Sequence, residues 1–116
     1  MTRHLRFGQQ GEQLAAQYLI ESGFTVLHRN WRHGRYEIDI IALRGQRLHI
    51  IEVKTRSTAA VYPEEAVTRK KFGHLLQAAD EFLYRHPEYR HVQYDILSIR
   101  LLRGNPEFLL LEDVYL

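Results

Sequence analysis

Residues 36–55 read YEIDIIALRGQRLHIIEVKT. The stretch contains two apolar runs separated by Gly45-Gln46, a two-residue connection with glycine first, as a type II′ hairpin prefers. We therefore predict two antiparallel strands, over residues 36–43 and 47–55. Charged residues interrupt both strands, and carboxylates among isoleucines are costly unless they are paired, hydrogen-bonded or bound to a metal. The charged positions are Glu37, Asp39, Glu52 and Lys54.

The two-residue turn also predicts the register of the hairpin. Pairing the strands outward from the turn places Asp39 opposite Glu52. The same register places Glu37 opposite Lys54, so that all four charges share one face. Two facing carboxylates favour a cation or a proton, and a site of oxygen ligands suits Mg²⁺ or Mn²⁺. The alternative is a surface hairpin in which Glu37 pairs with Lys54 and Asp39 faces water, because exposed cross-strand pairs are common and weak.

The composition indicates a single globular domain over residues 1–116, with 45% hydrophobic and 26% charged residues. The formal charge is only +2, so nucleic-acid binding would require local clustering of basic residues. The absence of cysteine excludes disulfides, thiolate zinc sites and cysteine nucleophiles. The apolar runs are far shorter than the ~20 residues of a membrane span, and the N-terminus lacks a signal-peptide core. We therefore expect a cytoplasmic protein without membrane contact.

The flanking sequence predicts two helices and three further strands from its periodicity. Gly23 and Pro87 are expected to end the helices, and Thr68 is a candidate internal cap for the second one. The predicted fold is α/β in the order α-β-β-β-α-β-β, with a mixed central sheet flanked by helices. The predicted helices cover residues about 5–22 and 64 or 68 to 86, a loop covers 56–63, and the further strands cover 24–31, 91–101 and 108–114.

The charged hairpin resembles the active-site signature of the PD-(D/E)XK nucleases, the restriction-endonuclease-like superfamily. An acidic residue on one strand, Asp39, precedes Glu52-Val53-Lys54 on the next. The resemblance implies an α-β-β-β-α-β core and a glutamate on the first helix, for which Glu12 is suitably placed. It also implies metal-assisted phosphodiester hydrolysis, with Asp39, Glu52 and the Val53 carbonyl holding Mg²⁺ or Mn²⁺. Glu12 would contribute directly or through water, and Lys54 would position the attacking water.

The chain also resembles the small bacterial YraN-like family over nearly its whole length. The likeness implies the same nuclease-like fold in a bacterial protein. That family usually has glycine just before its Glu-Ile-Asp segment, whereas this chain has Tyr36. The segments that carry the likeness are Gly8–Glu12, Ala15-Ala16, Tyr18-Leu19, Asn30–Arg32, Glu37–Ile41, Glu52–Arg56, Lys71, Ala78-Ala79 and Tyr94–Ile96.

Three further acidic residues have two interpretations each. Glu12 is either an active-site residue or an exposed carboxylate near a helix N-terminus, where the helix dipole favours it. Glu37 either belongs to the outer shell of the metal site or is simply the partner of Lys54. Asp95 lies in an otherwise apolar strand, and we expect it to make a structural hydrogen bond or salt bridge rather than to act in catalysis.

Four other residues are candidates for contacts with nucleic acid. Trp31 and Arg32 form an aromatic and basic patch that can stack on bases, although a structural role for Trp31 is equally compatible with the sequence. Lys71 belongs to a basic cluster near the start of the second helix and either contacts phosphate or is an ordinary solvated lysine. Arg56 follows the Glu-x-Lys segment.

We therefore predict a Mg²⁺- or Mn²⁺-dependent nuclease that acts on nucleic acid, with DNA favoured over RNA. Two alternatives remain open. One is a nucleic-acid-binding module that keeps the fold without turnover, and the other is a scaffold in which the charges only form salt bridges. The small size favours a homodimer, because one such domain offers little surface to embrace a duplex.

Overall fold

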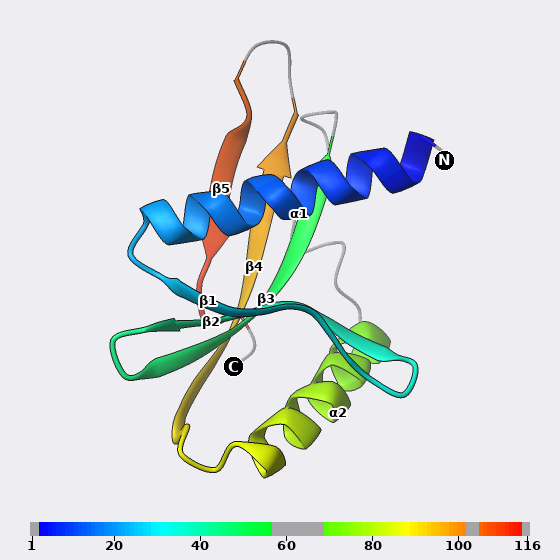
Figure 1. The fold of residues 1–116 in the computed structure, drawn as a ribbon. Coiled ribbons are helices and arrows are strands. Elements are labelled where there is room, and N and C mark those ends of the chain that lie inside the picture. The colour runs from blue at the N-terminus through cyan, green and yellow to red at the C-terminus, as the bar shows by residue number, and fades with distance from the viewer. Residues whose placement is uncertain (1–2, 57–68, 102–104, 115–116) are drawn as a thin grey trace.

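The computed structural model describes residues 3–56, 69–101 and 105–114. Its element order confirms the predicted α-β-β-β-α-β-β arrangement (Figure 1). The predicted loop beyond residue 56 and the Thr68 cap lie outside the described residues. Within those ranges, no helix is long and apolar enough to span a membrane. The elements are α1 (Arg3–Glu21), β1 (Thr25–His33), β2 (Tyr36–Arg44), β3 (Arg47–Arg56), α2 (Arg69–Arg85), β4 (His91–Arg100) and β5 (Glu107–Leu111).

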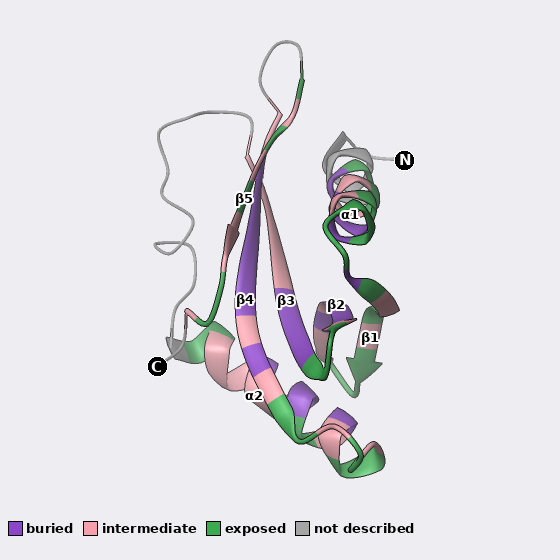
Figure 2. Cartoon of the chain, turned by 90° about the vertical axis from the view of Figure 1, so that its left-hand side faces the viewer, coloured by how far each residue is buried: buried purple, intermediate pink, exposed green. Residues whose placement is uncertain are grey.

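The five strands form one sheet in the order β1-β2-β3-β4-β5. Neighbouring strands are antiparallel except β3 and β4, which are parallel. A parallel pair needs a long crossover connection, and α2 lies within the segment that joins these two strands. The sheet is therefore mixed, as predicted, with α1 against one face and α2 against the other (Figures 1 and 2).

Each helix closes its own hydrophobic core against the sheet. Figure 2 shows that burial is concentrated along β3 and β4, between the two helices. The core under α1 includes Ala15, Leu19, Phe24, Ile40, Ala42, Ile51, Leu97 and Ile99. The core under α2 includes Ile38, Ile41, Leu48, Ile50, Leu75, Ala78, Ala79 and Phe82.

Gly23 ends α1, as the sequence predicted. Its φ of 96° is the left-handed conformation that favours glycine, and its N–H donates to Ile20 O at 3.1 Å. The next residue, Phe24, donates its N–H to Leu19 O at 2.9 Å, which completes a Schellman motif. Phe24 and Leu19 are both buried in the core under α1. The turn therefore returns the chain directly onto the sheet.

The β2–β3 hairpin follows the predicted register only over its first half. Arg44 pairs with Arg47, and Gly45 has a φ of 62°, as the first position of the turn requires. The pairing continues to Ile40 and Ile51 and ends there. The predicted facing pairs beyond that point, Asp39 with Glu52 and Glu37 with Lys54, are therefore wrong.

A side chain links the two strands where their backbone pairing ends. The Asp39 carboxylate accepts a hydrogen bond of 2.8 Å from Val53 N. The strands part at this point, and their outer ends are free to follow different neighbours. β2 stays paired with β1, where His33 faces Tyr36, while β3 stays paired with β4 as far as Arg56 and Arg100.

Asp95 anchors the N-terminal halves of β3 and β4. It is completely buried, and its Oδ2 lies 2.6 Å from Nδ1 of His49, which is also buried. Its Oδ1 accepts hydrogen bonds from Gln93 Nε2 at 3.0 Å and from Asp113 N at 2.8 Å. The expected structural role of Asp95 is confirmed, since the carboxylate joins β3, β4 and the segment after β5.

We predict that Asp95→Ala lowers the free energy of unfolding by about 3–5 kcal/mol, because it removes one partner of a buried pair and leaves the other uncompensated. Denaturant unfolding followed by circular dichroism measures this change. The control is Asp113→Asn, which keeps the backbone donor and tolerates the φ of 55° at that exposed position. Equal stability of the Asp95 variant and the wild type would contradict the anchoring role.

Gly11 of α1 and Gly73 of α2 differ in how much space surrounds them. A Cβ at Gly11 of α1 would lie 2.1 Å from Thr55 Oγ1 and 3.1 Å from Thr55 Cβ, whereas a Cβ at Gly73 of α2 would meet nothing within 4 Å. We expect Gly11→Ala to destabilise the fold by about 1–3 kcal/mol through overpacking. We expect Gly73→Ala to stabilise it by up to about 1 kcal/mol through helix propensity. Thermal unfolding of both variants checks the contrast, which fails if they shift the midpoint in the same direction.

Candidate functional site

A pocket of about 220 Å³ opens where β2 and β3 part, between these strands and the first turns of α2. It contains two of the predicted catalytic residues, Asp39 and Glu52, together with Glu37 and Lys71. Of its remaining lining residues, none had been predicted to belong to a functional site. These are Arg35, Tyr36, His74 and Leu75.

Three carboxylates converge at this opening. Oxygen atoms of Glu12, Glu37 and Asp39 all lie within 4.8 Å of one another, and the three residues are partly buried. Glu12 follows Gly11, the residue of α1 at which an added Cβ would meet Thr55 of β3. The structure thus brings Glu12 to Asp39 from 27 positions away in the chain. Such a set of oxygen ligands fits a hard divalent cation.

The environment of Asp39 disfavours its charged form. The pKa of Asp39 is raised to about 7, chiefly by burial, although the hydrogen bond from Val53 N opposes the shift. The neighbouring carboxylates of Glu52, Glu12 and Glu37 contribute smaller parts of the same rise, in that order. A bound cation would stabilise the ionised form against both effects. Asp39 is therefore a carboxylate whose surroundings suit either a proton or a metal ion.

Glu52 and Lys54 lie side by side on the face of β3 that α2 covers. They form an ion pair of 3.0 Å, with side chains only 19% and 13% exposed. Glu52 is not one of the three clustered carboxylates, but it lines the same pocket and its charge acts on Asp39. The surface-hairpin interpretation is therefore wrong, because these charges are largely withdrawn from solvent.

Glu37 pairs with Arg32 at 2.8 Å and not with Lys54, which corrects one of the two interpretations of this residue. The reason is the β1–β2 pairing, in which Arg32 lies opposite Glu37. Arg32, with a side chain 69% exposed, thus borders the acidic cluster.

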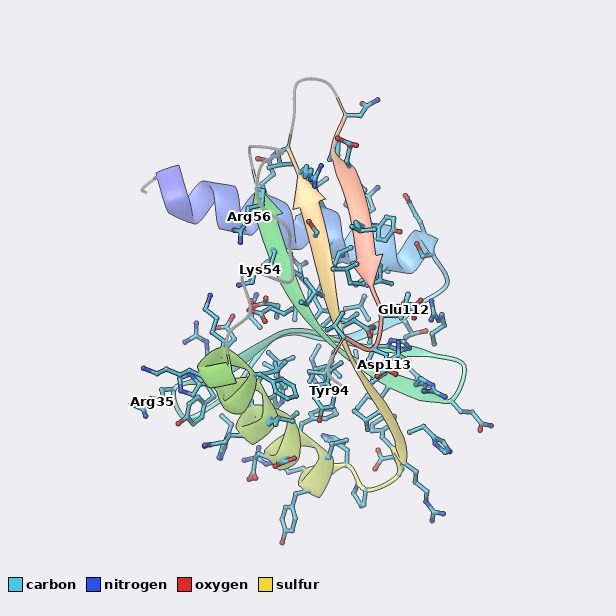
Figure 3. All side chains as sticks on the ribbon, turned by 180° about the vertical axis from the view of Figure 1, so that it is seen from behind. Arg35, Lys54, Arg56, Tyr94, Glu112 and Asp113 are labelled. Carbon is cyan, nitrogen blue, oxygen red and sulfur yellow. The ribbon has the colours of Figure 1, made fainter. Side chains whose placement is uncertain are left out.

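A second, basic group stands beside the acidic one. Lys71 of α2 approaches Lys54 of β3, and the charge of Lys54 is the main cause that lowers the pKa of Lys71, followed by their hydrogen bond. Arg56 adds to this effect. The Nε–H of Arg56 is buried and donates to no hydrogen-bond acceptor within the described ranges. Figure 3 shows Lys54 and Arg56 following one another along β3.

Trp31 contributes to packing. It is half-buried, its ring meets that of Phe82 edge-on at 5.4 Å, and the Arg85 guanidinium lies 5.9 Å from its ring centre. These contacts attach β1 to α2 and favour the structural interpretation of Trp31.

The pocket wall that sequence reasoning missed consists of Tyr36 and His74. Their ring centres are 4.8 Å apart. His74 and Leu75 follow Lys71 by three and four positions, so they share its side of α2. Their spacing from Lys71 could have predicted that these residues lie near it. Nothing in the sequence indicated that this side of α2 faces the start of β2.

Residues 11–99 match the model of the uncharacterised protein family UPF0102. The chain belongs to this family. It is 41% identical over 100 residues to a UPF0102 protein of Phocaeicola vulgatus, which covers 85% of this chain and 83% of the relative. It is 46% identical over 94 residues to a UPF0102 protein of Chlorobium phaeobacteroides, covering 79% of this chain and 75% of that relative. The predicted membership of the YraN-like family is thereby confirmed.

The fold of this UPF0102 protein is similar to that of Hjc, a Holliday junction resolvase from the archaeal hyperthermophile Archaeoglobus fulgidus. The superposition gives a TM-score of 0.56 and covers 87% of this chain and 74% of Hjc. At 21% sequence identity the likeness concerns the fold. The predicted restriction-endonuclease-like core is confirmed.

The raised pKa of Asp39 predicts how the stability of the metal-free protein depends on pH. The folded state keeps a proton that the unfolded chain, with a pKa near 3.8, releases. The contribution of Asp39 to stability is therefore complete at about pH 4, falls as the pH rises to about 7 and is lost above it. Asp39→Asn removes this contribution to the pH dependence, because asparagine has no proton to release.

Thermal unfolding in EDTA between about pH 5 and pH 8 measures the effect. We expect the midpoint of the wild type to fall more steeply than that of Asp39→Asn, and Mg²⁺ at about pH 8 to raise only the wild-type midpoint substantially. Parallel pH profiles of the two proteins would contradict the assignment.

Proposed function

We propose that this UPF0102 protein is a metal-dependent nuclease that hydrolyses phosphodiester bonds. The observation that carries the proposal is the convergence of Glu12, Glu37 and Asp39 within 4.8 Å, in a nuclease-like fold and beside the Glu52–Lys54 pair. Carboxylates at this spacing are stable in the ionised form only with a compensating cation.

In this proposal Asp39 and Glu52, with the Val53 carbonyl, hold Mg²⁺ or Mn²⁺. Glu12 contributes directly or through water, and Glu37 supports the site from its pair with Arg32. When bound, such an ion polarises phosphoryl oxygens and makes water more acidic.

Lys54 has two neighbours that define its role in the proposal. Its ion pair with Glu52 holds the ammonium at the border of the acidic cluster, where it orients the attacking water. On its other side stands Lys71, and Arg56 lies further along the same strand. Two adjacent ammonium groups repel each other, and an anionic phosphate between them would relieve that repulsion. Lys71 and Arg56 therefore serve as phosphate contacts in the proposal.

The proposed substrate is nucleic acid, with DNA favoured over RNA. The related fold of Hjc, a Holliday junction resolvase, supports this choice. Arg32 is an exposed basic residue of the β1–β2 hairpin that pairs with Glu37, and it is proposed to contact the backbone of the substrate. A homodimer would extend the binding surface, since the radius of gyration of one chain is 14.0 Å.

A cleavage panel tests the proposal. Duplex, single-stranded and branched DNA, and RNA, are incubated with the protein in Mg²⁺ or Mn²⁺. We expect the wild type to cut at least one substrate, and Asp39→Ala and Lys54→Ala to lower its rate by about 100-fold or more, because each removes a group that acts on the transition state. The matched control is Glu107→Ala, which removes an exposed carboxylate on β5.

The panel also separates the alternatives. Salt-sensitive binding that survives both substitutions, without cleavage of any substrate, would replace the nuclease proposal with a non-catalytic binding module. Absence of both cleavage and binding, together with no Mn²⁺ binding in calorimetry, would leave the scaffold interpretation.

A further inference from the structure

One wall of the pocket is aromatic and has no role in the chemistry proposed above. Tyr36, the first residue of β2, lies against His74 of α2 with ring centres 4.8 Å apart and planes inclined by 39°. The guanidinium of Arg35 stands 5.4 Å from the centre of the same tyrosine ring. All three residues line the pocket that contains Asp39 and Glu52.

The Arg35 side chain is held only weakly against the ring of Tyr36. Its hydrogen bond to the Tyr36 hydroxyl is long, at 3.4 Å, and its residue lies exposed at the tip of the β1–β2 hairpin. In Figure 3, Arg35 extends from that tip beside the start of α2. A planar ligand can therefore displace the guanidinium from the ring without disturbing the core. An arginine displaced in this way remains close enough to contact a phosphate.

The size of the pocket limits what it can hold. Its volume of about 220 Å³ is smaller than the ~300–1,000 Å³ of typical small-molecule sites. That space suits one base or sugar of a polymer whose phosphates lie outside. The aromatic wall and the basic residues Arg35 and Lys71 provide the two features that non-specific single-strand sites combine, namely a stacking surface and a cationic groove.

We propose that Tyr36 and His74 form a stacking subsite for the unpaired nucleobase next to the scissile phosphate. The inference rests on the proposed nuclease function and adds the substrate class, namely DNA with an unpaired base at the cleavage point. A base within a duplex presents both faces to its neighbours, so it must leave the stack before it can lie on Tyr36. The cost of leaving is smallest for single-stranded or mismatched bases, which are therefore the preferred substrates.

A binding experiment in Ca²⁺ tests the subsite apart from cleavage. The probe is a single-stranded DNA oligonucleotide that carries one 2-aminopurine, a base whose fluorescence falls when it stacks, and the same strand in a duplex is the comparison. We expect the wild type to quench the single-stranded probe and to bind it more tightly than the duplex. Tyr36→Leu should weaken single-strand binding by about 5- to 100-fold, and Tyr36→Phe by less than about twofold, because only the leucine variant loses the stacking ring.

Two further variants refine the test. His74→Ala removes the support behind the ring and should weaken binding in the same direction as Tyr36→Leu. The control is Tyr84→Leu, which removes a tyrosine that is 84% exposed on the same helix and should leave binding unchanged. Circular dichroism verifies that each variant is folded. The quenching of the 2-aminopurine probe by the wild type tests the subsite without any variant.

The outcomes separate this inference from the function on which it rests. Binding of single strands by a folded Tyr36→Leu protein as tightly as by the wild type, or binding by the wild type without quenching, overturns the subsite and leaves the nuclease proposal standing. Failure of the wild type to bind any nucleic acid overturns both.

Discussion

The hydrogen bond from Val53 N to the Asp39 carboxylate is the interaction on which the site depends. It forms where the backbone ladder between β2 and β3 stops, since Asp39 directly precedes Ile40, the last β2 residue that pairs with β3. From there β2 turns with β1 toward α2, and β3 continues along β4. The pocket opens beside the parting strands, and Asp39 is one of its lining residues. A hairpin that remained paired to its ends would place the same charges on a closed surface.

The site separates charge over a short distance. Glu12, Glu37 and Asp39 gather on one side, Lys54, Lys71 and Arg56 lie on the other, and Glu52 joins the two groups through its pair with Lys54. Like charges act on one another within each group, because neighbouring carboxylates help to raise the pKa of Asp39 and the charge of Lys54 lowers that of Lys71. Such mutual repulsion costs stability, and it is relieved when a cation meets the acidic group and an anion the basic one. This arrangement suits a cationic metal and a phosphate better than a structural ion-pair network.

The contrast with the second buried carboxylate, Asp95 of β4, supports this view. Asp95 is also a buried carboxylate, but its oxygens are occupied by His49, Gln93 and the backbone of Asp113. It is an anchor that ties the C-terminal segment to β3 and β4. The two carboxylates occupy similar apolar strands, and only their neighbours distinguish a structural role from a candidate site. The sequence indicated the anchor at Asp95 without identifying His49, whose place in an apolar strand carried no visible signal.

The sequence by itself determined the order of the elements, the turn at Gly45-Gln46 and the end of α1 at Gly23, because periodicity and glycine conformation act over a few residues. It also singled out Asp39, Glu52 and Lys54 as charged residues on adjacent strands, although the facing register predicted for them was wrong. Only the tertiary structure decided that the β2–β3 ladder ends at Ile40 and that Glu37 pairs with Arg32. It also decided that α2 brings Lys71 and His74 into one pocket with Tyr36 of β2. These features depend on the curvature of the sheet and the packing of helices across it, which join residues far apart in the chain and leave no local pattern.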